Sequence, residues 1–372
     1  MNKPIKQLND SLLDLHPDLI IQHCAITPYK IKLKKPLHTA SSSLYFREGL
    51  LIKLTANVLS TNTLTTNSIS TSSAYSAIGE CAPMIEIGTE SLLQAQQFLE
   101  KKSASITGQH LSAELLSDMD KFPACRFALE SALLSLIAQH SHKNIAGLLN
   151  SELLNSEVTP KIKVNTMLGA LNSDTLVQVK QAETNGFNCI KIKLGLNSIE
   201  TEAQQLKDLL ETILPSTLMR LDANKSWTLE QSEWLLNFLK PYERQIDGIE
   251  EPLKVFDNTA YQYLQSNTAI ALALDESFSS SDSLNTYPVK RLILKPMAQG
   301  GLLNTLERVR QAQQLNIETI VTSSIESGYG LWAISYLCAA INNQQYHGIA
   351  TASWLEETLI KPPEITHGII TI

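Results

Sequence analysis

Two lysines stand in a short segment that otherwise has the composition of a buried strand, Lys191 and Lys193 in "CIKIKLG" (189–195). Apolar residues alternate with them at a period of two, so both lysine side chains should point to the same face of a strand. Burial and the repulsion between two ammonium groups both favour the neutral amine, which is the form of lysine that acts as a base. Taken alone, the pattern is more typical of an edge strand with both lysines in water. The neighbouring segments must decide between the two interpretations.

Similar apolar segments recur along the chain, and each ends in a polar residue. In order, these residues are Asn165, Lys193, Asp222, Glu250, Asp275, Lys295 and Ser323. They follow one another at intervals of 20 to 29 residues, and a barrel of eight strand–helix units averages roughly 31 residues per unit. The spacing predicts a closed parallel barrel in which these side chains meet at the carboxyl ends of the strands, where active sites of such barrels are built.

The three carboxylates of this set, Asp222, Glu250 and Asp275, would repel one another in a partly dry mouth. A divalent cation offsets that cost, and oxygen ligands without His or Cys favour Mg²⁺, for which Mn²⁺ can substitute. Each residue alone has an ordinary explanation, as a helix N-cap or a charge in a solvated loop. However, all three occur at the same position of successive strand–helix repeats, which favours an active site.

The N-terminal part of the chain has a different organisation. Strand patterns within residues 20–58 and at 76–83, followed by helical patterns, predict an α+β capping domain over 1–155 with a Ser/Thr/Asn-rich insertion at about 59–76. The barrel is predicted over 156–345, and 346–372 should supply the last strand and return to the capping domain. The predicted fold class is therefore α/β, a (β/α)7β TIM-like barrel with an α+β N-terminal capping domain. An open doubly wound sheet is the alternative, although no Gly-x-Gly-x-x-Gly turn follows the first strand.

Composition restricts the class of partner. The 372 residues carry a formal net charge of −7 and are 43% hydrophobic. The absence of a long Lys/Arg run argues against nucleic-acid or membrane-surface partners and favours small-molecule ligands. Five scattered cysteines indicate neither a disulfide framework nor a zinc site. Together with the lack of a long apolar segment, they predict a cytoplasmic location.

The order of the motifs adds a family resemblance. Lys-x-Lys, Asp-Ala-Asn, Glu-Glu-Pro, Asp-Glu-Ser and Lys-Pro at successive strands resemble the enolase superfamily, in its muconate-lactonizing subgroup. Within that subgroup, "RLDANKSWT" (220–228), "GIEEP" (248–252) and "SSIESGYG" (323–330) are most similar to the o-succinylbenzoate synthases. The resemblance implies an enolase-like fold, a Mg²⁺ cofactor and a carboxylate substrate, 2-succinyl-6-hydroxy-2,4-cyclohexadiene-1-carboxylate.

The resemblance also implies a role for each site residue. The set comprises the metal ligands Asp222, Glu250 and Asp275, the catalytic lysines Lys191, Lys193 and Lys295, and the substrate-binding candidates Ser323, Ser324 and Gly328. Lys193 would remove the α proton and return a proton to the departing hydroxyl, Lys295 would lie as a cation beside the intermediate, and Lys191 would favour the neutral form of Lys193. A structural turn explains residues 323–328 equally well.

The reaction is not decided by these residues. N-succinylamino-acid racemases, dipeptide epimerases and muconate cycloisomerases of the same superfamily share the lysine pair and the metal. The segment "YHGIATAS" (346–353) lacks the Asp-x-Asp motif with which dipeptide epimerases hold a substrate amine. The resemblance therefore favours dehydration and keeps the other reactions as alternatives, and the sequence leaves the oligomeric state open.

Overall fold

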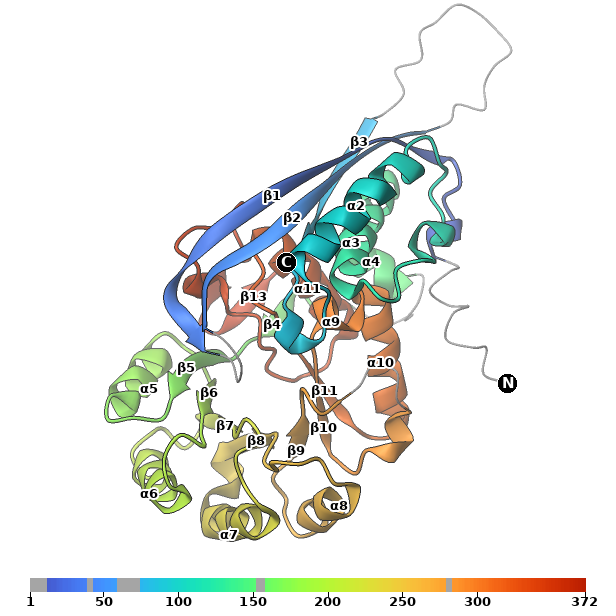
Figure 1. The fold of residues 1–372 in the computed structure, drawn as a ribbon. Helices are drawn as coiled ribbons and strands as arrows, with labels where there is room; N and C mark the ends of the chain where they lie inside the picture. The colour runs from blue at the N-terminus through green and yellow to red at the C-terminus, as the bar shows by residue number, and fades with distance from the viewer. Residues whose placement is uncertain (1–11, 39–42, 59–73, 152–157, 279–282) are drawn as a thin grey trace, which may run out of the picture.

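The computed structural model consists of an antiparallel sheet with its helices, packed against a parallel barrel (Figure 1). The residues that it describes are 12–38, 43–58, 74–151, 158–278 and 283–372. The predicted polar insertion at about 59–76 falls mainly outside these residues, and its last three residues begin a strand at Ala74. The predicted domain boundaries at 155 and 345 stay predictions.

The N-terminal sheet has the order β1-β2-β3 and is antiparallel throughout. Its strands are β1 (Leu19–His38), β2 (Ser43–Val58) and β3 (Ala74–Cys81). Helices α2 (Leu92–Ile106), α3 (Pro123–His140) and α4 (Ile145–Leu149) follow. Gly79 of β3 permits the close packing of α3, because a Cβ there would lie 1.8 Å from the backbone oxygen of Ala128. The strands and helices predicted for this part of the chain are confirmed.

Seven parallel strands follow in chain order around the barrel, with helices on the outside (Figure 1). The strands are β5 (Thr166–Ala170), β6 (Cys189–Lys193), β7 (Leu218–Asp222), β8 (Ile246–Glu250), β9 (Leu272–Leu274), β10 (Arg291–Leu294) and β11 (Glu318–Val321). The helices are α5 (Thr175–Thr184), α6 (Ile199–Leu210), α7 (Leu229–Leu239), α8 (Asn258–Ser266), α9 (Pro296–Gln299), α10 (Leu302–Gln314) and α11 (Gly328–Ile341). This order is the one that the repeat spacing predicts.

Local sequence signals set both ends of helix α7. At α7, the Thr228 hydroxyl accepts a hydrogen bond from the backbone of Gln231, whose side chain accepts one from the Thr228 backbone. This reciprocal capping box satisfies two N–H groups that a helix start leaves unpaired. Beyond Leu239 the chain tightens into a 3₁₀ turn that contains Pro241, which cannot continue the α-helical hydrogen bonding.

The barrel closes through the segment predicted as its last strand. Only two bridges form there, between His347 and Val164 and between Gly348 and Thr322, instead of a continuous strand. The amide of Asn165 donates to the His347 carbonyl at 3.0 Å, which joins the first barrel strand to this segment. Residues 347–348 thus occupy the position between the two ends of the seven-stranded sheet.

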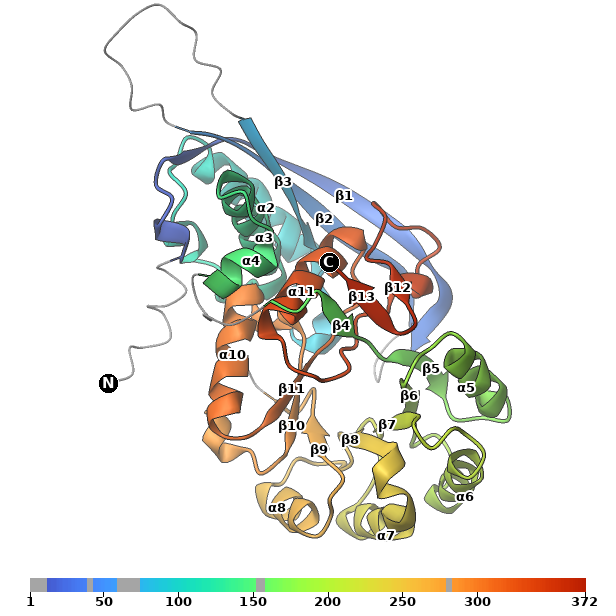
Figure 2. The ribbon, with the colours of Figure 1, turned by 180° about the vertical axis from the view of Figure 1, so that it is seen from behind.

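The C-terminal residues connect the two parts of the molecule. Strands β12 (Ile365–Thr366) and β13 (Ile369–Thr371) form a small antiparallel sheet with β4 (Lys161–Lys163), which lies between the N-terminal sheet and the barrel (Figure 2). The backbone of Leu355 also forms a bridge to Leu33 of β1. None of the helices in the described part of the chain has the length and apolarity that a bilayer-spanning helix needs.

Candidate active site

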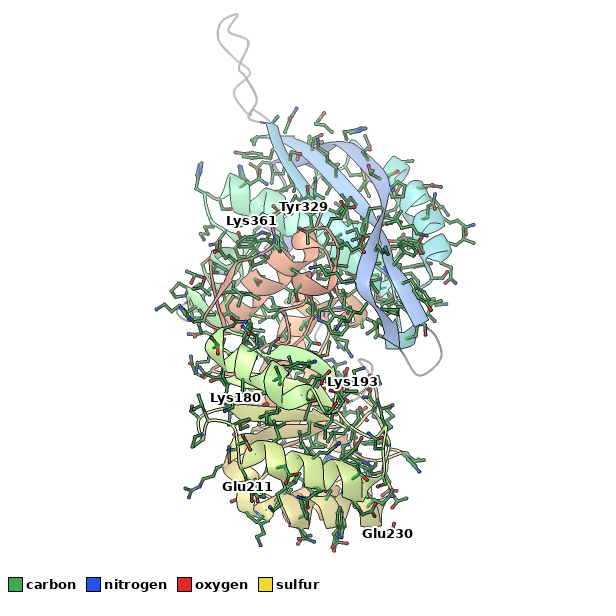
Figure 3. The ribbon with its side chains drawn as sticks, turned by 90° about the vertical axis from the view of Figure 1, so that its left-hand side faces the viewer. Lys180, Lys193, Glu211, Glu230, Tyr329 and Lys361 are labelled. Atoms are coloured by element: carbon green, nitrogen blue, oxygen red, sulfur yellow. The ribbon has the colours of Figure 1, made fainter. Side chains whose placement is uncertain are left out.

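Strand register brings the predicted lysines and carboxylates to one mouth of the barrel. Lys193 is in register with Asp222, and Asp222 with Glu250, so their side chains share a face at the carboxyl ends of β6, β7 and β8. Asp275 and Lys295 directly follow β9 and β10. Figure 3 shows Lys193 on the side of the barrel that faces the N-terminal sheet.

Two of the lysines form ion pairs with the three carboxylates. The Lys191 ammonium lies 2.9 Å from Asp222 Oδ2 and also pairs with Glu250, while Lys295 pairs with Asp275. Burial acts to lower the pKa of Lys191, but the carboxylates outweigh it and hold this pKa above its ordinary value. Lys191 is therefore a fixed positive charge between two of the carboxylates.

One carboxylate oxygen in this group is left without a hydrogen bond. Glu250 Oε1 is buried and has no hydrogen-bond partner among the described residues, and Arg220 Nε lies 3.9 Å from it. A buried carboxylate oxygen without a partner is costly, and a hard divalent cation with oxygen ligands would satisfy it. The ligand atoms of Asp222, Glu250 and Asp275 do not all come within 4.8 Å of one another. As a donor set, three carboxylates of which one has an unsatisfied oxygen fit Mg²⁺.

Below the mouth, a buried network that the sequence interpretation missed supports these residues. Arg220 donates to Asp247 at 2.8 Å and to Asn165 at 2.9 Å, and Arg291 donates to Asp247 at 2.7 Å and to Glu318. Burial acts to raise the pKa of the Asp247 carboxyl, but the two arginines outweigh it and hold this pKa below its ordinary value. Arginine inside an apolar strand, as in "LMRLD" (218–222), is the signal that could have predicted this network.

Glu251 has a positioning role instead of the solvated charge that its place in a loop would suggest. Its carboxylate accepts hydrogen bonds from the backbone amides of Asp275 and Ser277 at 2.7 and 2.8 Å, and from the Ser277 hydroxyl at 2.7 Å. Glu251 itself has a φ of 46°, a conformation uncommon outside glycine. The second glutamate of "GIEEP" thus fixes the backbone that carries the predicted ligand Asp275.

The three substrate-binding candidates lie in the loop after β11 and at the start of α11. The Ser323 hydroxyl is 2.6 Å from that of Thr351, and the Ser324 amide donates to Glu326 at 2.7 Å. Gly328 packs directly against the backbone of Ile360, because a Cβ there would lie 2.5 Å from the Ile360 carbonyl oxygen. The structure explains Ser323 and Gly328 by packing and hydrogen bonding within the protein, and their role in binding substrate stays a prediction.

Two residues of the N-terminal sheet hold this loop, and the sequence interpretation did not single them out. Arg47 of β2 donates to the carbonyls of Ser324 and Ile325, both at 3.2 Å. Glu80 of β3 accepts from the Ser327 amide at 2.8 Å and hydroxyl at 2.7 Å, and from the Gly330 amide at 2.8 Å. A carboxylate at the N-terminus of α11 is also favoured by the helix dipole.

The same loop shows backbone strain and unsatisfied polar atoms. Ile325 has a φ of 61°, which is an outlier for a β-branched residue. Ser324 Oγ and Glu326 Oε1 are buried without a hydrogen-bond partner among the described residues. Burial raises the pKa of Glu326 to about 7, against an opposing effect of Arg47. Strain held in place by cross-domain contacts is a feature of functional loops.

Comparison with known proteins identifies the family. Residues 174–372, more than half of the chain, match the family described as enolase C-terminal domain-like. The chain belongs to the enolase superfamily. An o-succinylbenzoate synthase of Pasteurella multocida (strain Pm70) is 28% identical over 367 residues, which cover 95% of this chain and 96% of that protein.

Solved structures of the superfamily share the fold. A dipeptide epimerase from Methylococcus capsulatus, complexed with Mg and the dipeptide L-Arg-D-Lys, has a TM-score of 0.80 at 19% identity, with 95% of this chain and 97% of that one covered. The muconate lactonizing enzyme from Pseudomonas fluorescens, complexed with muconolactone, has a TM-score of 0.77 at 17% identity, with 95% and 94% covered. The predicted enolase-like barrel with its N-terminal capping domain is confirmed, and superfamily members bind Mg²⁺, as the epimerase complex does.

Proposed function

We propose that the protein catalyses the Mg²⁺-dependent dehydration of 2-succinyl-6-hydroxy-2,4-cyclohexadiene-1-carboxylate to 2-succinylbenzoate, a step of menaquinone biosynthesis, in the cytoplasm. The observation that carries the proposal is the similarity to an o-succinylbenzoate synthase over 95% of the chain. The presence of three carboxylates and three lysines around one barrel mouth supports it, because the reaction needs a base, a cation and a metal site.

The positions of Lys193 and Lys295 suit a substrate held between them. Their strands, β6 and β10, are separated by three strands in the sheet order, and residues 347–348 close an eighth position. Strands four positions apart in an eight-position barrel lie on opposite sides of it. A substrate ring at the mouth would therefore have one lysine on each face.

In the proposed step, Lys193 takes up one proton and releases it again. As a neutral amine, Lys193 takes the α proton of the ring carbon that bears the carboxylate, and the C–O bond to the hydroxyl breaks. The resulting ammonium returns the proton to the departing hydroxyl, so water leaves and Lys193 is neutral again. Lys295 remains an ammonium beside the delocalised negative charge.

The carboxylates Asp222, Glu250 and Asp275 would hold Mg²⁺, which supplies positive charge beside the substrate carboxylate as the α proton leaves. Lys191 is ion-paired with two of these carboxylates, so its positive charge offsets their mutual repulsion. Its influence on the protonation of Lys193 remains part of the proposal.

Epimerisation is the second candidate, because a dipeptide epimerase has a TM-score of 0.80 with this chain. That reaction needs both Lys193 and Lys295 to exchange protons with the substrate. The absence of an Asp-x-Asp motif in 346–353 argues against a dipeptide substrate, and N-succinylamino acids and muconate remain alternatives.

The test is a substrate panel with purified protein and Mg²⁺. The panel comprises the cyclohexadiene carboxylate, N-succinylamino acids, dipeptides and muconate. For each compound, turnover is measured by the change in absorbance and by α-proton exchange in D₂O. We expect dehydration with a kcat of roughly 1–1,000 s⁻¹ and much slower racemisation. A larger kcat/KM for racemisation would overturn the proposed reaction and leave the superfamily membership intact.

A further inference from the structure

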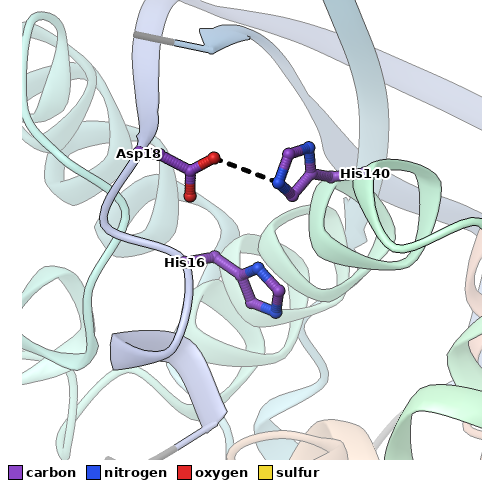
Figure 4. A group of neighbouring side chains, drawn as sticks. All are labelled: His16, Asp18 and His140. Atoms are coloured by element: carbon purple, nitrogen blue, oxygen red, sulfur yellow. Dashed lines mark ion pairs between the residues drawn. The ribbon is translucent and has the colours of Figure 1, made fainter. Parts of the chain in front are cut away.

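Two histidines and an aspartate of the N-terminal part of the chain lie close together (Figure 4). The ligand atoms of His16, Asp18 and His140 all lie within 4.8 Å of one another. His140 Nε2 is 3.1 Å from Asp18 Oδ2, and the two imidazole rings are perpendicular with centroids 5.6 Å apart. Superfamily membership and the proposed reaction assign no role to this group, the His–Asp–His cluster.

The backbone on both sides of the cluster is fixed. His16 and Asp18 come just before β1, where the carbonyl of the residue between them, Pro17, is 2.5 Å from the ring nitrogen Nδ1 of His110. The Leu19 amide donates to the His16 carbonyl at 3.2 Å. His140 is the last residue of α3, a helix that is buried along most of its length. His140 therefore projects from a helix, and His16 and Asp18 from a turn that these contacts hold in place.

The orientation of His140 suits metal binding. Its Nδ1 lies 3.5 Å from the Tyr75 hydroxyl, so Nε2 is the nitrogen directed to Asp18. A metal-binding histidine commonly has its second ring nitrogen oriented by such a polar group, which fixes the ring. The side chains of His140 and Asp18 are 23% and 40% exposed, so an ion and a water ligand can enter from solvent.

We propose that the His–Asp–His cluster binds a Zn²⁺ ion that joins the segment before β1 to the end of α3. Two imidazoles and one carboxylate, with water in the fourth position, form a common zinc ligand set, whereas Mg²⁺ prefers oxygen ligands alone. Ligand atoms of a tetrahedral zinc are about 3.3 Å apart, given bond lengths of about 2.0–2.1 Å. Rotation of the half-buried side chains would bring the cluster to this spacing.

A second group with close ligand atoms has a structural explanation. Cys81, Glu90 and Cys125 also come within 4.8 Å of one another, but all three are buried. The Glu90 carboxylate accepts hydrogen bonds from the backbone amides of Ala124 and Cys125 at 3.1 and 2.8 Å. It therefore caps the start of α3 and needs no metal.

The experiment separates the zinc site from the barrel mouth. The full-length protein is saturated with Mg²⁺ and titrated with Zn²⁺, and heat of binding and Tm are measured. We expect one zinc site per chain and a Tm that rises with zinc. His140→Gln should weaken zinc binding by more than about 10-fold, because even a supporting residue of a metal site is worth that much. His23→Gln, at an exposed histidine of β1, is the matched control and should leave zinc binding unchanged.

Two further variants keep the outcome interpretable. Asp275→Asn should lower Mg²⁺ affinity and leave zinc affinity unchanged, a result that would exclude zinc binding at the barrel mouth. If His140→Gln does not fold, Asp18→Asn preserves the size of the side chain and should also weaken zinc binding. Equal zinc affinity in the native protein and in the cluster variants, or no zinc bound, would overturn the proposal and leave the cluster as a contact between the side chains of Asp18 and His140.

Discussion

At the scale of single residues, the three lysines at the barrel mouth differ in their ion pairs, and the proposed base is the one without a carboxylate partner. Lys191 and Lys295 are held by carboxylates, whereas Lys193 has no carboxylate within ion-pairing distance among the described residues. A general base must bind and release a proton in each turnover. Lys193 is the lysine whose surroundings suit that task.

Replacing Lys193 with alanine should therefore remove the proton-transfer step. We expect Lys193→Ala to lower kcat by roughly 100- to 10,000-fold, the usual contribution of a general acid–base group, and to abolish α-proton exchange in D₂O. Circular dichroism should show an intact fold. If turnover of every carboxylate on the panel stayed at the native rate, the protein would not use this site as an enzyme.

Asp275 tests the metal site. Asp275→Asn removes one anionic ligand and should lower Mg²⁺ affinity, measured by calorimetry, and lower kcat by at least about 100-fold, the cost of losing one electrostatic contact to the transition state. Its melting curve should change little. Asp120→Asn, at an exposed aspartate, is the control. Full activity of the native protein after exhaustive chelation would contradict the metal requirement.

At the scale of elements, the strands of the N-terminal sheet complete the barrel mouth. Arg47 is 4% exposed, and besides the two loop carbonyls it donates to the Pro83 carbonyl at 2.8 Å. It thereby ties the end of β3 to the loop after β11. Such a clamp can hold the strained Ile325, whose conformation costs on the order of 1–3 kcal/mol.

Releasing the clamp should affect substrate binding more than chemistry. We expect Arg47→Met to raise KM with a smaller change in kcat, and to lower Tm, since several buried carbonyls lose their donor. Steady-state kinetics and thermal melting measure both effects. Lys53→Met removes an exposed basic residue of the same strand and should change neither. A native KM in Arg47→Met would show that the loop keeps its conformation without the clamp.

At the scale of the whole molecule, acid should destabilise the fold through the segment that closes the barrel. His347 is fully buried and accepts a hydrogen bond from the Val321 amide at 3.0 Å. Burial, together with the charge of Arg220, lowers its pKa to about 3. Between about pH 3 and 6.5 the unfolded chain binds a proton that the folded chain excludes, so the free energy of unfolding falls as the pH is lowered.

This contribution can be isolated by substitution. In His347→Asn the amide oxygen can still accept from Val321, but no group titrates. We expect the native protein to lose stability relative to the variant by up to about 1.4 kcal/mol per pH unit below pH 6.5, measured by denaturant unfolding from pH 7 to 4. A parallel pH dependence in both proteins would show that other groups dominate.

The sequence by itself determined the periodic features of this protein. The interval between polar strand ends gave the barrel, and the alternation in "CIKIK" placed Lys191 and Lys193 on one face. The capping box at Thr228 set the start of α7. These features depend on residues close in the chain or on a regular repeat. They can therefore be predicted without knowing which distant segments come into contact.

Only the tertiary structure decided the contacts between distant segments. Arg47 and the loop it holds are 277 residues apart, and no local pattern distinguishes a buried arginine of the N-terminal sheet from a solvated one. The same is true of Glu251, and of His140 beside Asp18, because ion pairing and burial depend on which chain segments fold together. Residues 347–348 close the barrel by pairing with Val164 and Thr322, which lie next to opposite ends of the seven-stranded sheet. The composition of the segment does not show that only these two bridges form, because they depend on how the two ends of the sheet come together.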